Sequence, residues 1–204
     1  ASVRYDLMRI GYDVDSGEWG ELETVVSAAE TGMSILQPKV SPDGRYLVCT
    51  MADHGNFPIF LASSDLYVVD LQQGGYRRLE INSDEAADSW HSWSSNSRWL
   101  VFSSKRRDGL FARPYFTYVD EAGHFHRPVM LPQEDPSFYD GFIQTVNVPV
   151  LVNGRVEVSQ RALAQAIISP DRVKKATLDQ RVAVSAPYAD DETPTEPYSS
   201  GTAP

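Results

Sequence analysis

Cysteine is almost absent from this chain: its 204 residues include only Cys49. One thiol cannot form an internal disulfide, attach a haem through a Cys-x-x-Cys-His motif or build a zinc cluster. Cys49 lies in the apolar run 46–49, where we expect it to act as a small buried hydrophobic residue. The cysteine content therefore leaves the redox compartment open.

Three further features are missing. No run approaches the ~20 apolar residues of a membrane-spanning helix, no secretory signal is visible, and there is no Gly-x-Ser-x-Gly hydrolase elbow. Basic residues are also few: the chain has 18 Lys and Arg but 28 Asp and Glu, which gives a formal net charge of −10. Such a surface repels phosphate. We therefore expect no transmembrane segment, no nucleic-acid partner and no covalent catalysis by this chain.

What the sequence does contain is a repeat. The segment 41–50 recurs at 94–103, a shift of 53 residues, with Ser, Arg, Leu and Val identical and an aromatic residue after Arg in both copies. The first copy opens with Ser41, Pro42, Asp43 and Gly44. Proline presets the second position of a turn and glycine accepts a positive φ, so the motif predicts a tight turn. The second copy lacks Pro, Asp and Gly, and we expect a different turn type there.

An apolar strand follows each copy and ends in an Asp-to-Gly stretch that predicts a hairpin loop. The stretches are Asp70 to Gly74, Asp120 to Gly123 and, near the N-terminus, 13–17. Each unit then reads as four strands. The expected strands are 36–40, 46–50, 66–70 and 76–81 in one unit, and 90–93, 99–103, 115–120 and 126–131 in the next. Residues 5–26 read as the outer half of a third unit.

Units of ~40–50 residues with four strands are typical of propeller blades. We predict an all-β fold, a partial β-propeller of about two and a half four-stranded antiparallel blades, with a short C-terminal helix and an extended tail. A generic antiparallel sandwich is the alternative. The expected domains are blades at 1–136, an extension that packs on the last blade at 137–184, and an acidic Pro-rich tail at 185–204. Within the extension, Ser159 predicts the start of a helix over 160–168.

These motifs resemble the TolB-like propeller repeats of bacterial envelope proteins. The family pattern of Ser-Pro-Asp-Gly-Arg, an apolar strand, Leu-Tyr-Val-Asp-Leu and a Gly turn reads here as 41–45, 66–71 and Gly74. The stretch 90–140 resembles the final blade of large TolB-like proteins, and the whole resemblance covers about 10–156. It implies the fold and a periplasmic or extracellular location on the bacterial envelope, but no chemistry. The same turns occur in propellers of prolyl-oligopeptidase-type peptidases, so a propeller segment of such an enzyme is a further alternative.

Two clusters could suggest chemistry. His124 and His126 alternate on an expected strand and could hold a metal, but they adjoin a turn, so we interpret them as a solvated hairpin. Asp88, Ser89 and His91 are the residue types of a hydrolase triad, yet triads are assembled from distant segments. Strand alternation would also place Ser89 and His91 on one side and Asp88 on the other. We interpret this stretch as an inner strand with Trp between blades, and expect no catalytic residue, metal or cofactor.

The loops after the second and fourth strands of a blade emerge on one face, so loops 53–63, 82–88 and 105–108 should share a rim. Propeller rims are rigid and rich in loops, and they suit protein recognition. The candidate interaction residues are Asp53, His54, Asn56, Trp90, His91, Arg106, Arg107 and Asp108.

We therefore expect a non-enzymatic protein-binding or assembly module of the bacterial cell envelope. The alternative is a propeller fragment or subunit of a larger envelope enzyme complex, of multihaem redox or peptidase type, whose catalytic groups lie in another chain. A propeller ring needs at least about four blades. We therefore predict that another polypeptide, either the other product of a cleaved precursor or a partner subunit, completes the propeller by pairing with the strand at 5–12.

Overall fold

The computed structural model of the chain describes residues 3–169. The tail predicted at 185–204 and the part of the predicted extension beyond Ser169 lie outside the described residues. The chain divides into two compact units, Ala1–Arg155 and Val156–Pro204. In the described part of the second unit, helix α2 (Gln160–Ile168) begins at the predicted residue, because the Ser159 hydroxyl accepts a hydrogen bond from the Ala162 amide. None of the described helices is long and apolar enough to cross a membrane.

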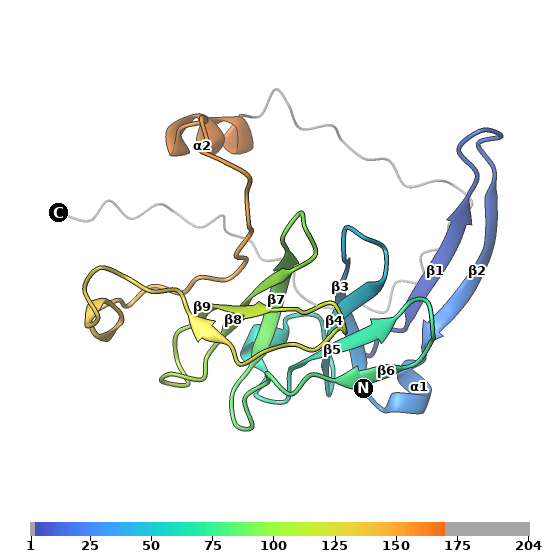
Figure 1. The fold of residues 1–204 in the computed structure, drawn as a ribbon, viewed down its shortest axis with the longest axis horizontal. Coiled ribbons are helices and arrows are strands. Elements are labelled where there is room, and N and C mark those ends of the chain that lie inside the picture. Colours follow the sequence, from blue (N-terminus) through green and yellow to red (C-terminus); the bar gives the residue numbers. More distant parts are fainter. Residues whose placement is uncertain (1–2, 170–204) are drawn as a thin grey trace, which may run out of the picture. The chain divides into compact units, whose positions relative to one another are not determined.

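Two four-stranded antiparallel sheets form the centre of the first unit, each with its strands in sequence order (Figure 1). The first sheet contains β3 (Ser34–Val40), β4 (Tyr46–Ala52), β5 (Asp65–Asp70) and β6 (Tyr76–Arg78). The second contains β7 (Asp88–Trp93), β8 (Trp99–Ser104), β9 (Arg113–Tyr118) and β10 (Val129–Met130). Each sheet is one blade, so the structure confirms the all-β partial propeller.

A two-stranded hairpin flanks the first blade. Strand β1 (Leu7–Tyr12) pairs with β2 (Trp19–Val26), and neither joins another sheet in the described part of the chain. A short helix that the sequence did not suggest, α1 (Ala28–Thr31), connects the hairpin to the blade. Ser27 caps its first turn, and Gly32 ends it with a φ of +71°.

Two apolar clusters hold these layers together. One lies between the blades and includes Val48, Phe102 and Trp93. The other lies between the hairpin and the first blade and includes Leu47 and the free Cys49. Strand β4 supplies both clusters because successive residues of a strand point to opposite faces. Burial raises the pKa of the Cys49 thiol to about 12, which agrees with its predicted role as a buried hydrophobic residue.

The outer strands are shorter than the sequence predicted. Strand β6 ends at Arg78 rather than at residue 81, and β10 has only two residues instead of the six at 126–131. After β6 the chain turns inward, so that Leu79 and Ile81 become part of the core between the blades. The Asn82 side chain fixes this turn by donating to the Leu79 carbonyl oxygen at 2.8 Å.

The prediction of a different turn in the second repeat is wrong. In the first copy the Ser41 hydroxyl donates to the Asp43 carboxylate at 2.6 Å, and in the second the Ser94 hydroxyl donates to Asn96 at 2.7 Å. Ser97 adopts a φ of +58°, the conformation that a glycine takes in the first copy. Its hydroxyl accepts a hydrogen bond from the Asp43 amide at 3.0 Å, so the second turn also binds the first.

The repeat also contains an offset that the sequence match missed. Tyr46 pairs with Asp70, and the equivalent Trp99 pairs with Tyr118 rather than with Asp120. The Asp120 turn therefore begins two residues further along its strand than the Asp70 turn. Aligning the two copies of the repeat at Asp70 and Asp120 hides this offset. Each aspartate opens a turn and accepts a hydrogen bond from an amide of that turn, so the two residues look equivalent in the sequence.

Candidate functional site

The structure brings the predicted rim loops to one edge of the two blades. Asp53, His54 and Asn56 are exposed in the loop after β4. The Lys105 amide donates to the Ala87 carbonyl oxygen at 3.1 Å, which joins the loop after β8 to the segment before β7. The Lys105 ammonium also lies 5.2 Å from the centre of the Phe60 ring, which connects this loop to the one after β4.

Arg106, at this rim, is held by an ion pair with the fully buried Asp88. Its guanidinium donates to the Asp88 carboxylate and to the Ile81 carbonyl oxygen, each at 2.8 Å. Burial raises the pKa of Asp88, while the charge of Arg106 opposes this shift. Breaking such a pair would leave a buried charge uncompensated, so we assign Arg106 to the framework of the rim. Arg107 is more exposed and pairs with Asp140.

His91 does not lie on the rim surface. It is only 3% exposed, and its Nε2 donates to the Val48 carbonyl oxygen of the neighbouring blade over 2.8 Å. Burial lowers the pKa of the ring to about 4, so the ring is neutral at pH 7. His91 therefore joins the two blades through its Nε2, while its Nδ1 has no hydrogen-bond partner within the described residues.

The expected face alternation along β7 also fails. A bulge interrupts its pairing with β8 between Ser89 and Ser92, and Trp90 has a φ of +51°. Asp88, Ser89 and His91 are all buried, because both faces of this blade are covered. Within the described residues the Ser89 hydroxyl has no hydrogen-bond partner, and the three side chains do not form a triad.

The β7 bulge has a counterpart in the first blade. Gln37, which lies 53 residues before Trp90, has a φ of +54° at a similar irregularity of β3. Its side-chain oxygen accepts a hydrogen bond from the Trp90 amide at 3.1 Å. Two strained inner-strand residues thus meet between the blades. Because each recurs with the repeat and binds the other blade, we interpret the strain as part of the blade architecture.

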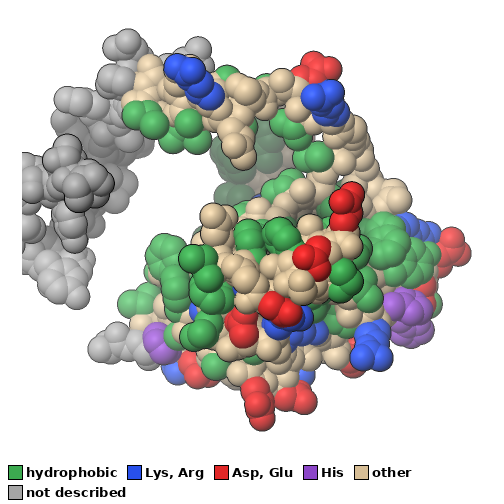
Figure 2. Space-filling model, turned by 90° about the vertical axis from the view of Figure 1, so that its left-hand side faces the viewer, with side chains coloured by type: hydrophobic (Ala, Val, Ile, Leu, Met, Phe, Trp, Pro, Cys, Tyr) green, Lys and Arg blue, Asp and Glu red, His purple; other side chains and the backbone are tan. Residues whose placement is uncertain are grey.

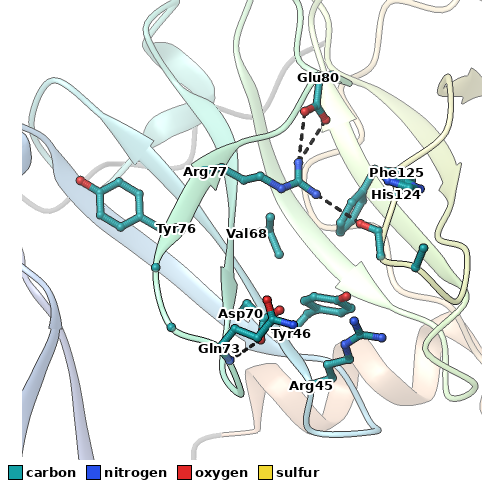
Figure 3. Close-up of a pocket in the computed structure, with 14 residues that line it drawn as sticks. Arg45, Tyr46, Val68, Asp70, Gln73, Tyr76, Arg77, Glu80, His124 and Phe125 are labelled. Carbon is teal, nitrogen blue, oxygen red and sulfur yellow. Dashed lines mark hydrogen bonds and ion pairs between the residues drawn. The ribbon is translucent and has the colours of Figure 1, made fainter.

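On the opposite edge, a pocket of about 760 Å³ lies between the turns of the two blades (Figure 3). Arg77 extends across it, pairs with Glu80 at 3.1 Å and donates to the Gly123 carbonyl oxygen at 3.2 Å. Arg45 donates to the Glu121 carbonyl oxygen at 2.9 Å. These bonds hold both guanidiniums against the wall of the pocket that the second blade supplies.

The histidine pair lies beside this pocket and is not arranged as a metal site. His124 Nδ1 and His126 Nε2 each lie 3.2 Å from the same oxygen of Asp120. The His124 backbone amide also donates a hydrogen bond to Asp120. This bond contributes most to lowering the pKa of Asp120 to about 2, and the two imidazole rings add to the effect. In the part of the chain that is described, no cluster of three possible ligands has metal-binding geometry.

The hairpin presents an exposed apolar face that was not among the candidate residues. Ile10 lies opposite Leu22, and Tyr12 lies opposite Trp19 with ring centres 4.6 Å apart. Trp19 is 66% exposed and Leu22 is 62% exposed. The alternation of Met8, Ile10 and Tyr12 in the sequence could have revealed this face.

No family model matches the chain, and no curated protein matches it. Among solved structures, the chain is similar to one of hydrazine synthase from Kuenenia stuttgartiensis, with 12% identity and a TM-score of 0.37. The similarity covers 57% of this chain and 34% of that chain, so this chain spans about a third of its length.

Proposed function

We propose that the chain is a non-enzymatic assembly module in which another polypeptide supplies the missing inner strands of the β1–β2 hairpin. The observation that carries this proposal is the hairpin itself, a two-stranded sheet beside two four-stranded blades. We place the module at the periplasmic or extracellular face of a bacterial envelope, on the resemblance of its repeat motifs to TolB-like propellers.

The loop of the hairpin makes the same hydrogen bonds as the loop between β5 and β6 of the first blade. The Gly17 amide donates to the Asp13 carbonyl oxygen and the Gly74 amide to the Asp70 carbonyl oxygen, each at 2.9 Å. Both aspartate side chains accept two further amides of their loops. Strand β1 is therefore equivalent to β5, with a shift of 57 residues between Asp13 and Asp70.

This equivalence specifies what is missing. In the first blade β5 pairs with β4, so that Tyr46 lies opposite Asp70, and the Leu71 amide donates to the Arg45 carbonyl oxygen at 2.9 Å. A strand equivalent to β4 would run antiparallel to β1 with its first residue opposite Asp13. Val14 corresponds to Leu71, and its side chain is 82% exposed. We expect its amide to bind the incoming strand.

The same equivalence explains the exposed apolar face. Tyr67 and Val69 of β5 point toward the hairpin and take part in the cluster beneath it. Their counterparts are Ile10 and Tyr12, which point away from the first blade and are exposed. Open strand edges and contiguous apolar surface favour association. An incoming blade would cover both.

Photo-crosslinking of the full chain in its native host tests this proposal. A benzophenone amino acid replaces Ile10, and a control places it at Gln72, which is exposed in the β5–β6 turn. The Ile10 probe should crosslink to one other polypeptide, at a segment that mass spectrometry maps to a strand next to a tight turn. The Gln72 probe should give no such adduct.

A charge in the apolar face provides the second arm. Leu22→Asp should abolish the Ile10 crosslink and leave circular dichroism unchanged, because Leu22 is already exposed in the free chain. Crosslinks from Ile10 only to the same chain, or an adduct that survives Leu22→Asp, would contradict the proposal.

A further inference from the structure

The outward face of the second blade is buried although no third blade follows it in the described residues. Leu100 and Phe102 of β8 point into the core between the blades. Val101 and Ser103 point the other way and are nevertheless buried. Val101 lies 53 residues after Val48, which the second blade covers. Another group must therefore cover Val101 where a third blade would do so.

Residues 142–153, which we call the strap, cover this face. At one end Arg113, which is almost fully buried, donates to the carbonyl oxygens of Gln144 at 2.6 Å and Phe142 at 2.5 Å. In the middle the Ser103 hydroxyl lies 2.7 Å from the carbonyl oxygens of Val146 and Asn147.

At the other end of the strap, the Asn153 amide group lies 3.0 Å from the Ser95 hydroxyl. Ser95 belongs to the turn before β8, whereas Ser103 is near the end of that strand. The strap therefore crosses the whole blade face along the strand direction.

Apolar contacts accompany these hydrogen bonds. Leu151 lies with Trp99 and Phe116 around one hollow of about 430 Å³, and Val150 lies with Val101 around a second of about 310 Å³. Apolar side chains gather on this side of the molecule (Figure 2). The strap thus shields the face without filling it as densely as a blade would.

We propose that the strap is a terminal cap that takes the place of a third blade, so that assembly proceeds only from the hairpin. The assembly is then an open arc in which each chain has one docking end. The direction of assembly rests on the proposed function, but the cap is a property of the chain alone and is tested separately.

The test uses the full chain with Leu22→Asp, so that the hairpin does not contribute to association. Leu151→Asp adds a charge on the side of the strap that lines both hollows. Val148→Asp is the matched control, because Val148 is exposed on the same strap. Sedimentation should show at least a tenfold lower dissociation constant for self-association in the Leu151 variant than in the control. Two variants that both remain monomeric would overturn the cap.

A covalent link provides a second test. Ser95→Cys with Asn153→Cys should react within one molecule with a short bismaleimide that replaces the length of the Asn153 side chain, because the Asn153 Nδ2 and the Ser95 Oγ are 3.0 Å apart and Cys49 is buried. Closing this link in the Leu151→Asp chain should restore the monomer. A folded chain in which the pair fails to close would overturn the proposal. The two proposals fail in distinguishable ways. If only the hairpin proposal is wrong, the Ile10 probe gives no crosslink to another polypeptide, while the strap variants still behave as stated.

Discussion

Acidification should weaken the contact between the blades through His91. The ring is buried and neutral, with its pKa lowered to about 4 from the ordinary histidine value of 6.5. Between these values the unfolded chain binds a proton that the folded chain does not, so the free energy of unfolding falls as the pH drops from 6.5 to 4 and the effect levels off below. The shift corresponds to a loss of about 3 kcal/mol, at 1.36 kcal/mol for each pH unit.

Urea unfolding at pH 7, 6, 5 and 4 measures this effect, and His91→Gln removes the titrating group while keeping an amide that can face the Val48 carbonyl oxygen. Burial raises the pKa of Asp88, which opposes the trend at low pH in both proteins. The difference between the two proteins therefore isolates His91. It should change by about 3 kcal/mol in favour of the variant between pH 7 and 4.

His54→Gln is the matched control, because the His54 ring is exposed on a loop, and its profile should follow that of the original chain. A constant difference between His91→Gln and the original chain across this pH range would refute the reasoning.

Two more predictions concern the turn edge of the blades. Gly123→Ala should lower the free energy of unfolding by about 2–4 kcal/mol, because its φ is +83° and an added Cβ would collide with the Tyr46 side chain. Gly74→Ala, which has a similar φ but open space around it, should cost only about 1 kcal/mol; equal losses in chemical denaturation would contradict the clash. Asp120→Asn should lower the melting temperature near pH 6, where the carboxylate is charged in both states. Because the pKa of Asp120 is lowered to about 2, chiefly by the His124 amide, its stabilisation is present above about 3.8 and lost as the pH falls through 2, so a deficit that persists below pH 2 would argue against this assignment.

The sequence was sufficient to predict most of the blade architecture. The 53-residue shift and the Asp-to-Gly stretches predict the strand order, and the apolar run around Cys49 predicts a buried strand. Strand alternation could not predict the direction of the His91 side chain, because a bulge with a positive φ at a tryptophan leaves no mark in residue type. The turn at Ser97 was mispredicted for a related reason. Its backbone follows that of the first copy, although serine replaces glycine.

The candidate site was less predictable. Loop positions at the rim follow from blade connectivity, but His91 is a candidate whose side chain faces the neighbouring blade. The position of the strap could not be predicted from the sequence. Ser103 and Arg113 bind it through its backbone carbonyl oxygens, and these hydrogen bonds depend on tertiary placement rather than on the residue types of the extension. The hairpin face could have been found by applying the alternation rule to Met8, Ile10 and Tyr12.

The arrangement of hairpin, blade, blade and strap makes the first unit a one-dimensional stack. In the described residues one apolar cluster joins the hairpin to the first blade and the other joins the two blades, and β4 separates them, with Leu47 on one side and Val48 on the other. Stability in such a stack is approximately a sum of layer terms and interface terms. Loosening of the hairpin removes one interface and leaves the contacts between the blades in place. Unfolding can therefore begin at the uncapped hairpin end and advance layer by layer toward the strap.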